Sequence, residues 1–422
     1  MRRTVLLTLG MLPLALGMRL AFPPDAAEAS SSKIIYSFVG GADGAYPESD
    51  LIVDAAGNLY GTTNRGGTGC GTVFELTRTK DGWTHQVLYS FGNASSDGCG
   101  PTAGLVFDSA GNLHGTTAGG GSSGSGTVFK LAGNSHGGWT ESILYSFTGS
   151  NGDGASPNTD LIFDSQGNLY GTTAGGGQNH CYSGCGIVFR LTPNSNGTWT
   201  ESTIYAFAGV PDGANPASAV ILDADGNIYG TTAYGGTEKC AGGEWFRGCG
   251  AVYKLMPNSG GGWTETLLYN FHRFQGTARY PSGGFLFDMT GRIVGTSTEG
   301  GDEFGTVFQL EQTKTAWGQS VLNRFYGYPD GAYPVGRLAM GLSGKFYGAT
   351  TGGGTNSYQY NGTVFELEQT KGGWRERVLL SASSVAYNPQ AGPTVDSQGY
   401  VYGTFAGSSN GNNFGAVYEI IP

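Results

Sequence analysis

Basic residues are scarce in the sequence: 22 lysines and arginines face 32 aspartates and glutamates, and the formal net charge is −10. Nucleic-acid binding is unfavourable for such a chain, because it depends largely on contacts of lysine and arginine with phosphates. Beyond residue 30 the sequence lacks an apolar run of the roughly 20 residues that a membrane-spanning helix requires. It also lacks the 3.6-residue apolar period of a long amphipathic helix. These absences favour an all-β protein without a membrane span.

Residues 1–29 have the features of a secretory signal peptide. Two arginines precede an apolar stretch that is interrupted by Arg19, and small residues lead to Ala29. Because this stretch is too short for a membrane anchor, we predict cleavage near Ala29. Residues 30–422 would then be the exported protein, in the periplasm or the medium.

Glycine is abundant, with 77 residues, and it recurs with a period. A repeat of roughly 55 residues is typical of a propeller or a related array in which each unit is one supersecondary motif. Because one repeat covers the chain, residues 30–422 are predicted to form a single domain. The motif Gly-Asn-Leu-Tyr-Gly-Thr-Thr, or a close variant, places its second glycine at Gly61, Gly115, Gly171, Gly230, Gly295, Gly348 and Gly403.

Each unit contains four predicted strands, which we call a, b, c and d in chain order. In the first unit, residues 51–54 and 59–63 flank a polar turn and form one hairpin, and residues 71–77 and 83–91 form a second. Their alternating branched, aromatic and small residues fit half-buried antiparallel strands.

The chain begins and ends in different parts of the unit. Residues 34–38 have the pattern of a d strand, and residues 415–421 have the pattern of a c strand. Pairing of these two segments would close a ring and cover an exposed edge, whereas a β-solenoid, the main alternative, needs no such offset. The sequence therefore predicts an all-β, seven-bladed β-propeller with four antiparallel strands per blade, whose N-terminal strand closes the last blade.

The recurring segments resemble a known family. Gly-Asn-Leu-Tyr-Gly-Thr-Thr, Gly-Thr-Val-Phe-x-Leu, Gly-Trp-Thr-Glu and Leu-Tyr-Ser-Phe are similar to the GloVer tandem repeat of secreted bacterial proteins, and the resemblance extends over essentially all of residues 34–422. It implies a secreted bacterial repeat protein, and it supplies no catalytic residues.

Residues that recur in every unit are interpreted as blade-forming. A tryptophan opens six predicted d strands and is expected to pack between blades. An aspartate that ends strand a is expected to accept backbone N–H groups of the following turn. The tryptophans are Trp83, Trp139, Trp199, Trp263, Trp317 and Trp374, and the aspartates are Asp54, Asp108, Asp164, Asp223, Asp288 and Asp396.

The dipeptide Asp-Gly recurs in the d–a loops, which connect successive units. A ring of calcium sites is the alternative to ordinary turns here. Because calcium takes roughly six to eight oxygen ligands and each loop offers one carboxylate, we favour turns, and no metal or cofactor is expected. The aspartates are Asp43, Asp97, Asp153, Asp212 and Asp330.

Six cysteines in an exported protein predict three disulfides. Two of the predicted pairs each lie within a single b–c loop. The third pair joins a b–c loop to the following d–a loop, which lies on the same face of a propeller. A metal site in the b–c loop of blade three would lack a fourth ligand. The predicted pairs are Cys70–Cys99, Cys181–Cys185 and Cys240–Cys249.

Departures from the repeat mark candidate functional residues. Long insertions fall in the b–c loops of blades three and four, and the d–a loop after blade four replaces Asp-Gly with a histidine, arginines and a phenylalanine. Aromatic and arginine side chains on disulfide-braced loops suit ligand binding, while packing of these loops over the propeller is an equally weighted alternative. The candidates are His180, Tyr182, Glu244, Trp245, Phe246, Arg247, His272, Arg273, Phe274 and Arg279.

Three functions remain open. The favoured one is a monomeric binding module for an extracellular glycan or surface protein, acting through the loops of blades three to five. The alternatives are a lyase- or lactonase-type enzyme with its site at the central channel, and a purely structural envelope protein. None of the five histidines has a partner at a spacing that defines an acid, base or nucleophile, so no catalytic residue is assigned.

Overall fold

The computed structural model describes residues 31–178, 180–181, 183–216, 218–237, 240, 248–274, 276–281, 283–301, 303–354, 361–382, 388–407 and 413–422. The predicted signal peptide, residues 1–29, lies outside this part of the chain. The described residues contain strands and one short 3-10 helix, η1 (Gly41–Asp43), and no α-helix. No helix among them is long and apolar enough to cross a membrane.

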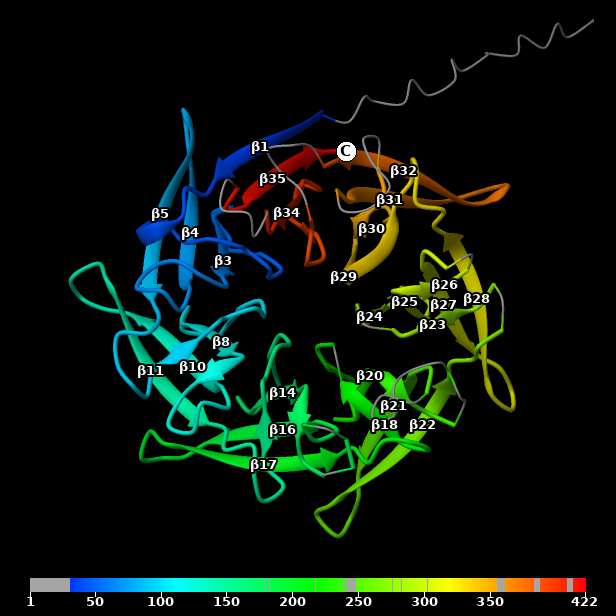
Figure 1. Ribbon diagram of the computed structural model, residues 1–422, viewed down its shortest axis with the longest axis horizontal. Helices are drawn as coiled ribbons and strands as arrows, with labels where there is room; N and C mark the ends of the chain where they lie inside the picture. The colour runs from blue at the N-terminus through cyan, green and yellow to red at the C-terminus, as the bar shows by residue number, and fades with distance from the viewer. Residues whose placement is uncertain are drawn as a thin grey trace, which may run out of the picture.

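Seven antiparallel sheets surround a central axis like the blades of a propeller (Figure 1). Blade one contains β2 (Ile52–Val53), β3 (Leu59–Thr63), β4 (Thr72–Thr79) and β5 (Gly82–Ser90); blade two contains β7 (Val106–Phe107), β8 (Leu113–Thr117), β10 (Thr127–Gly133) and β11 (Trp139–Ser146). Blade three contains β13 (Ile162–Phe163), β14 (Leu169–Thr173), β16 (Ile187–Pro193) and β17 (Trp199–Ala206); blade four contains β19 (Ile221–Leu222), β20 (Ile228–Gly235), β21 (Ala251–Pro257) and β22 (Trp263–Asn270).

The remaining blades have the same order from the axis outward. Blade five contains β24 (Phe285–Phe287), β25 (Ile293–Ser297), β27 (Thr306–Gln312) and β28 (Trp317–Arg324). Blade six contains β29 (Ala332–Met340), β30 (Phe346–Gly352), β31 (Thr363–Thr370) and β32 (Gly373–Ser381). Blade seven contains β33 (Thr394–Val395), β34 (Val401–Phe405), β35 (Ala416–Ile421) and β1 (Ser31–Ser37). The predicted seven-bladed propeller with four strands per blade is confirmed.

Short strands join the loops of one face to each other. The d–a loop that precedes a blade pairs with the b–c loop of that blade, which fixes both loops on the same side of the propeller. These pairs are β6 (Gly98–Cys99) with β9 (Gly119–Gly120), β12 (Gly154–Ala155) with β15 (Gly175–Gly176), β18 (Gly213–Pro216) with β20, and β23 (Ala278–Arg279) with β26 (Glu299–Gly300).

An aromatic contact crosses most seams between neighbouring blades. Phe91, which follows strand d of blade one, lies edge-on to Phe129 in strand c of blade two, with ring centroids 5.0 Å apart. The corresponding pairs are Phe38–Phe74, Phe147–Phe189, Phe207–Tyr253, Phe271–Phe308 and Phe325–Phe365. In the remaining seam, Ala382 and Tyr418 take these two places in one buried cluster.

The second glycine of the Gly-Asn-Leu-Tyr-Gly-Thr-Thr motif makes room for the strand c ring of the same blade. A Cβ atom at Gly115 would lie 2.6 Å from Cζ of Phe129, and one at Gly230 would lie 2.2 Å from the hydroxyl oxygen of Tyr253. Because both rings are fully buried, they cannot move aside without opening a cavity. The motif therefore keeps its glycine for packing.

The recurring tryptophans and aspartates occupy the structural positions that the sequence predicts. Trp83 of blade one packs on Tyr402 of blade seven, with ring centroids 6.0 Å apart. Asp54 accepts the backbone N–H groups of Ala56 and Asn58 at 2.8 and 2.9 Å, as expected for a residue that holds the a–b turn. These residues build blades and turns.

The Asp-Gly loops are also turns. Asp97 accepts the hydroxyl of Tyr89 at 3.2 Å and the backbone N–H groups of Gly92 and Gly98, each at 2.7 Å. The carboxylate is thus engaged by its own loop, as an ordinary turn requires. Among the described residues, no group of three or more histidine, cysteine, aspartate or glutamate side chains could hold a metal ion.

A glutamate of strand d faces the loop aspartate across four seams. Oε1 of Glu141 is buried and has no hydrogen-bond partner among the described residues. Burial, and then the negative charge of Asp97, raise the pKa of Glu141 to about 7. The same two causes raise the pKa to about 7 at Glu201 beside Asp153, Glu265 beside Asp212 and Glu376 beside Asp330.

These glutamates predict a pH-dependent stability. A carboxyl group whose pKa is raised by folding keeps a proton that the unfolded chain releases, so its contribution is complete at low pH and is lost as pH rises from about 5 to about 8. Glutamine at all four positions should flatten this fall in the free energy of unfolding, measured by urea denaturation across that range. Blade five already carries Gln319 at this position. The exposed Glu311→Gln variant is the control, and an unchanged pH profile in the fourfold variant would contradict the prediction.

The N-terminal strand completes blade seven, as predicted. β1 pairs antiparallel with β35, from Ser31 opposite Ile421 to Ser37 opposite Ala416, and Figure 1 shows the blue strand beside the red one. The buried Glu419 forms ion pairs with Lys33, at 2.5 Å, and with Arg78 of blade one, at 3.6 Å. The ends of the chain therefore close the ring through both backbone and charged contacts.

Removal of β1 should open the ring. A chain that begins at Val39 leaves the edge of β35 unpaired, and unpaired edges promote association with other chains. We expect it to unfold at a temperature lower by about 10 °C or more and to aggregate, compared with a chain that begins at Ser31. Calorimetry and light scattering measure both effects. Equal unfolding temperatures for the two chains would show that closure by β1 is dispensable.

Candidate functional site

The six cysteines form the three predicted disulfides, Cys70–Cys99, Cys181–Cys185 and Cys240–Cys249. The first joins the b–c loop of blade one to the following d–a loop, and the other two close the b–c loops of blades three and four. All three lie on the face that carries the predicted binding residues. The loops of this face are therefore covalently braced.

Half of the predicted binding residues can be located. Tyr182, Glu244, Trp245, Phe246 and Arg247 lie outside the described residues. His180 is exposed on the b–c loop of blade three. The other four lie in the loop after β22 or in β23, which follows it: His272, Arg273, Phe274 and Arg279.

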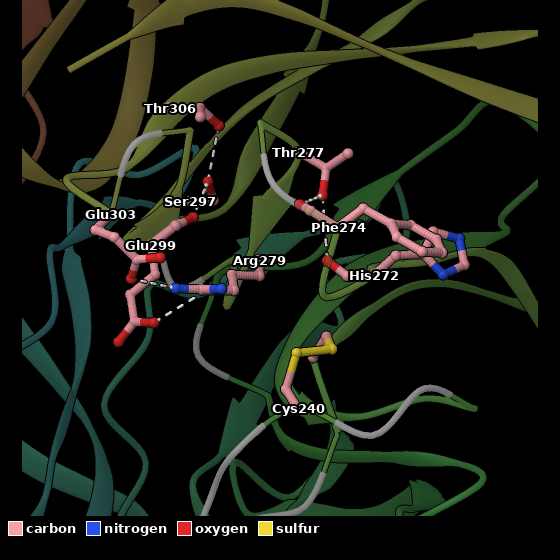
Figure 2. A network of polar contacts seen from close by, with 10 residues as sticks. Cys240, His272, Phe274, Thr277, Arg279, Ser297, Glu299, Glu303 and Thr306 are labelled. Atoms are coloured by element: carbon pink, nitrogen blue, oxygen red, sulfur yellow. Dashed lines mark hydrogen bonds and ion pairs between the residues drawn. A yellow bond between two sulfur atoms is a disulfide. The ribbon is translucent and has the colours of Figure 1, made fainter. Parts of the chain in front are cut away.

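The loop after β22 holds an exposed aromatic ring in a defined position. The hydroxyl of Thr277 donates to the backbone oxygens of His272 and Phe274, at 3.2 and 2.7 Å (Figure 2). The His272 ring lies between Tyr269 and Phe274, with centroids 5.7 and 5.8 Å away. Phe274 itself is 71% exposed. An aromatic side chain of this kind, held on an ordered loop, can contact a ligand at little cost in conformational freedom.

Arg279 braces this region. Its Nε atom donates to Glu299 at 3.1 Å, and a terminal nitrogen of its guanidinium group donates to Glu303 at 2.6 Å (Figure 2). Because both carboxylates belong to the b–c loop of blade five, the guanidinium group ties the d–a loop to that loop. Arg279 therefore links two loops of this face, and two of its nitrogens are engaged in ion pairs within the protein.

A second set of charged residues lies at the central axis, where the sequence analysis assigned none. In each unit one residue lies at the channel, four positions before the residue that follows strand a, which is Asp54 in blade one. Its occupants are Asp50, Gly104, Asp160, Ala219, Gly284, Arg337 and Gly392; the first six line a cavity at the axis, and Gly392 donates its N–H to Asp50. Four of these residues are glycine or alanine. The three charged residues depart from the repeat, and that departure was the signal that could have found them.

Two cavities meet at these channel residues. One, of about 140 Å³, is lined mainly by polar side chains and glycines, including Ser49, Thr102 and Asn158. The other, of about 390 Å³, is lined by apolar side chains such as those of Ile52 and Ile162. Asp50, Asp160 and Arg337 line both cavities.

The channel aspartates each bond to a neighbouring blade. Asp50 accepts the backbone N–H of Gly392 in blade seven at 2.7 Å, and Asp160 accepts that of Gly104 in blade two at 2.6 Å. Burial, and then the charge of Asp160, raise the pKa of Asp50, while Arg337 and the Gly392 N–H oppose the rise. The channel thus contains a carboxyl pair whose members repel each other and one guanidinium group nearby.

Comparison with protein families identifies the repeat. A model of the Gloeobacter/Verrucomicrobia repeat matches residues 24–182. The match covers the first two blades and part of the third. The predicted resemblance to the GloVer family is confirmed. No curated protein matches the sequence significantly.

Solved structures resemble this propeller in fold. A domain described as the extracellular domain of a hybrid two component system from B. thetaiotaomicron aligns with 91% of the chain, at 10% sequence identity and a TM-score of 0.52. The chain spans 39% of the length of that protein. The periplasmic gluconolactonase of Pseudomonas aeruginosa aligns with 79% of this chain and 85% of its own, at 15% identity and a TM-score of 0.49.

Two of the five histidines have structural roles. His114 stands where other blades have a strand b tyrosine, and its Nε2 atom lies 3.2 Å from Oδ2 of Asp108, the aspartate of the a–b turn. His85 stacks on Tyr36, with ring centroids 4.4 Å apart, and its Nδ1 atom lies 3.2 Å from Asp43. Both histidines lie in seams between blades, and neither lines the channel cavities.

The bracing role of Arg279 predicts a small, salt-sensitive effect on stability. Because Glu303 is largely exposed, its ion pair is screened, and Arg279→Ala should lower the free energy of unfolding by about 1 kcal/mol at low salt and by less at high salt. Arg273→Ala, on the same loop and exposed, should change it by less than about 0.5 kcal/mol. Denaturant titrations at two salt concentrations measure both. Equal effects of the two substitutions would remove the bracing role.

Proposed function

We propose that the protein is a secreted propeller that binds an extracellular glycan through the loops of blades three to five. The observation that carries this proposal is Phe274, which is 71% exposed although its loop is fixed by hydrogen bonds. Covering this ring with a ligand would remove apolar surface from water, which favours binding.

The chemistry around Phe274 suits a carbohydrate. The ring can pack against the apolar face of a sugar, as aromatic side chains do in many binding sites. The neighbouring His272 and Arg273 add polar groups for the hydroxyls around that face, and the sequence predicts further aromatic and charged contacts from Trp245 and Arg247. A protein partner would use the same aromatic anchor, and it is an outcome of the test below.

Export is part of the proposal. The three disulfides support an oxidising compartment, because cytosolic thiols are kept reduced. The predicted signal peptide of residues 1–29 gives the route. The predicted single domain of residues 30–422 would then be the mature protein.

A glycan screen on residues 30–422 tests the proposal. We expect saturable binding of at least one extracellular polysaccharide, with affinity reduced roughly tenfold or more by Phe274→Ala. The matched control is Met289→Ala, which removes a similarly exposed apolar side chain, 77% exposed, from an a–b turn on the opposite face. Equal binding by both variants would move the site away from blade five. Absence of glycan binding, with crosslinking to a surface protein that depends on Phe274, would replace the glycan by a protein partner.

A further inference from the structure

The channel residues are the largest departure from the repeat outside the loops. Where the other four blades have glycine or alanine, blades one, three and six have Asp50, Asp160 and Arg337. In blade seven the fold requires glycine at this position, because a Cβ atom at Gly392 would lie 2.0 Å from the backbone oxygen of Arg337. Three charged side chains in a narrow channel are costly to desolvate, and the propeller closes without any at the other blades.

The protein leaves much of this charge unused. Among the described residues, the hydrogen bonds of Asp50 and Asp160 are one backbone N–H each, to a single oxygen of each carboxylate. Within the same residues, Arg337 forms no hydrogen bond and no ion pair, although its charge acts on Asp50. By contrast Glu48, another acidic residue lining the polar cavity, accepts from Nδ2 of Asn64 at 2.8 Å. Two carboxylates and one guanidinium group therefore remain available to a ligand.

The two cavities differ in chemistry on the two sides of these charges. The polar cavity, of about 140 Å³, is close to the roughly 150 Å³ that accommodates a benzene molecule. The apolar cavity, of about 390 Å³, is lined by Ile52, Val106, Ile162, Leu338 and Val395. A ligand that fits both must carry charges of both signs at one end and an apolar group at the other.

We propose that the channel binds a free α-amino acid with an apolar side chain. Its ammonium group would lie against Asp50 and Asp160, and its carboxylate would accept hydrogen bonds from Arg337, whose planar group suits a carboxylate. Its side chain would fill the cavity around Ile162 and Leu338, where it loses contact with water. A divalent cation would satisfy the aspartates alone and would be repelled by Arg337. The proposed function does not enter this inference, because no residue of the blade four and five loops is used.

The ammonium group would also replace a proton. Burial, and then the negative charge of Asp160, raise the pKa of Asp50, which favours its protonated form when no cation is bound. A cation beside Asp50 favours its ionised form. Binding should therefore release protons, which makes the calorimetric heat depend on the ionisation enthalpy of the buffer.

Calorimetry on residues 30–422 with leucine and two derivatives tests the site without altering the protein. Leucine should bind at one site. N-acetylleucine, which lacks the ammonium group, and leucinamide, which lacks the carboxylate, should each bind roughly tenfold more weakly or worse. Glutamate should not bind, because its side chain carries a charge into the apolar cavity. Equal binding of leucine and N-acetylleucine, or no binding of leucine at millimolar concentration, would overturn the proposal.

Variants assign the two charged ends separately. Arg337→Met should lower the affinity for leucine roughly tenfold or more and leave the affinity for leucinamide unchanged, whereas Asp160→Asn should lower both affinities. Asp225→Asn, on an exposed a–b turn, is the matched control and should bind like the native chain. The Phe274→Ala variant should lose glycan binding and retain leucine binding, so the two proposals can fail independently. Loss of leucinamide binding in Arg337→Met as well would contradict the assigned orientation.

Discussion

The structure depends on one repeated contact, the packing of aromatic rings across the seams between blades. Phe91 and Phe129 show it in its simplest form, edge-on and fully buried, with centroids 5.0 Å apart. Each ring needs space in its own blade, and Gly115 provides it because any side chain there would overlap Phe129. The glycine of strand b and the aromatic residue of strand c are thus two halves of one constraint, which explains why the motifs recur together in the sequence.

The blade that closes the ring is held by other contacts in addition. Six seams have an aromatic pair, and the seam between blades six and seven has Ala382 and Tyr418 in its place. Blade seven is also the blade assembled from both ends of the chain, through β1 and β35. Its buried Glu419, paired with Lys33 and Arg78, links that blade onward to blade one. Charged and backbone contacts therefore hold the blade on which the ring closes.

The fold was predictable from the sequence because each repeat specifies the same local structure and the offset of the two ends specifies closure. The disulfides followed from the same topology, since Cys70 and Cys99 could meet only if b–c and d–a loops share a face. The bracing role of Arg279 was not predictable: Glu299 and Glu303 lie some twenty residues away in the next blade, and only strand pairing brings them together. The channel was missed for another reason. Asp50 and Asp160 precede strand a in segments that otherwise match the repeat, so their departure is visible only once that position is known to face the axis.

Evolution of a site on a repeat protein is constrained by what the repeat must keep. Seam positions such as Gly115 and Phe129 admit little change, since the first needs glycine and the strand c position carries phenylalanine or tyrosine in every blade. Loop tips and the channel positions are free of that restriction, since neither takes part in the aromatic contact. The unusual residues of this chain occur at those two places, Phe274 on the loops and Asp160 in the channel. A propeller built in this way can therefore carry a surface site and an axial site separately, and the seven-bladed architecture permits both without a change in the seams.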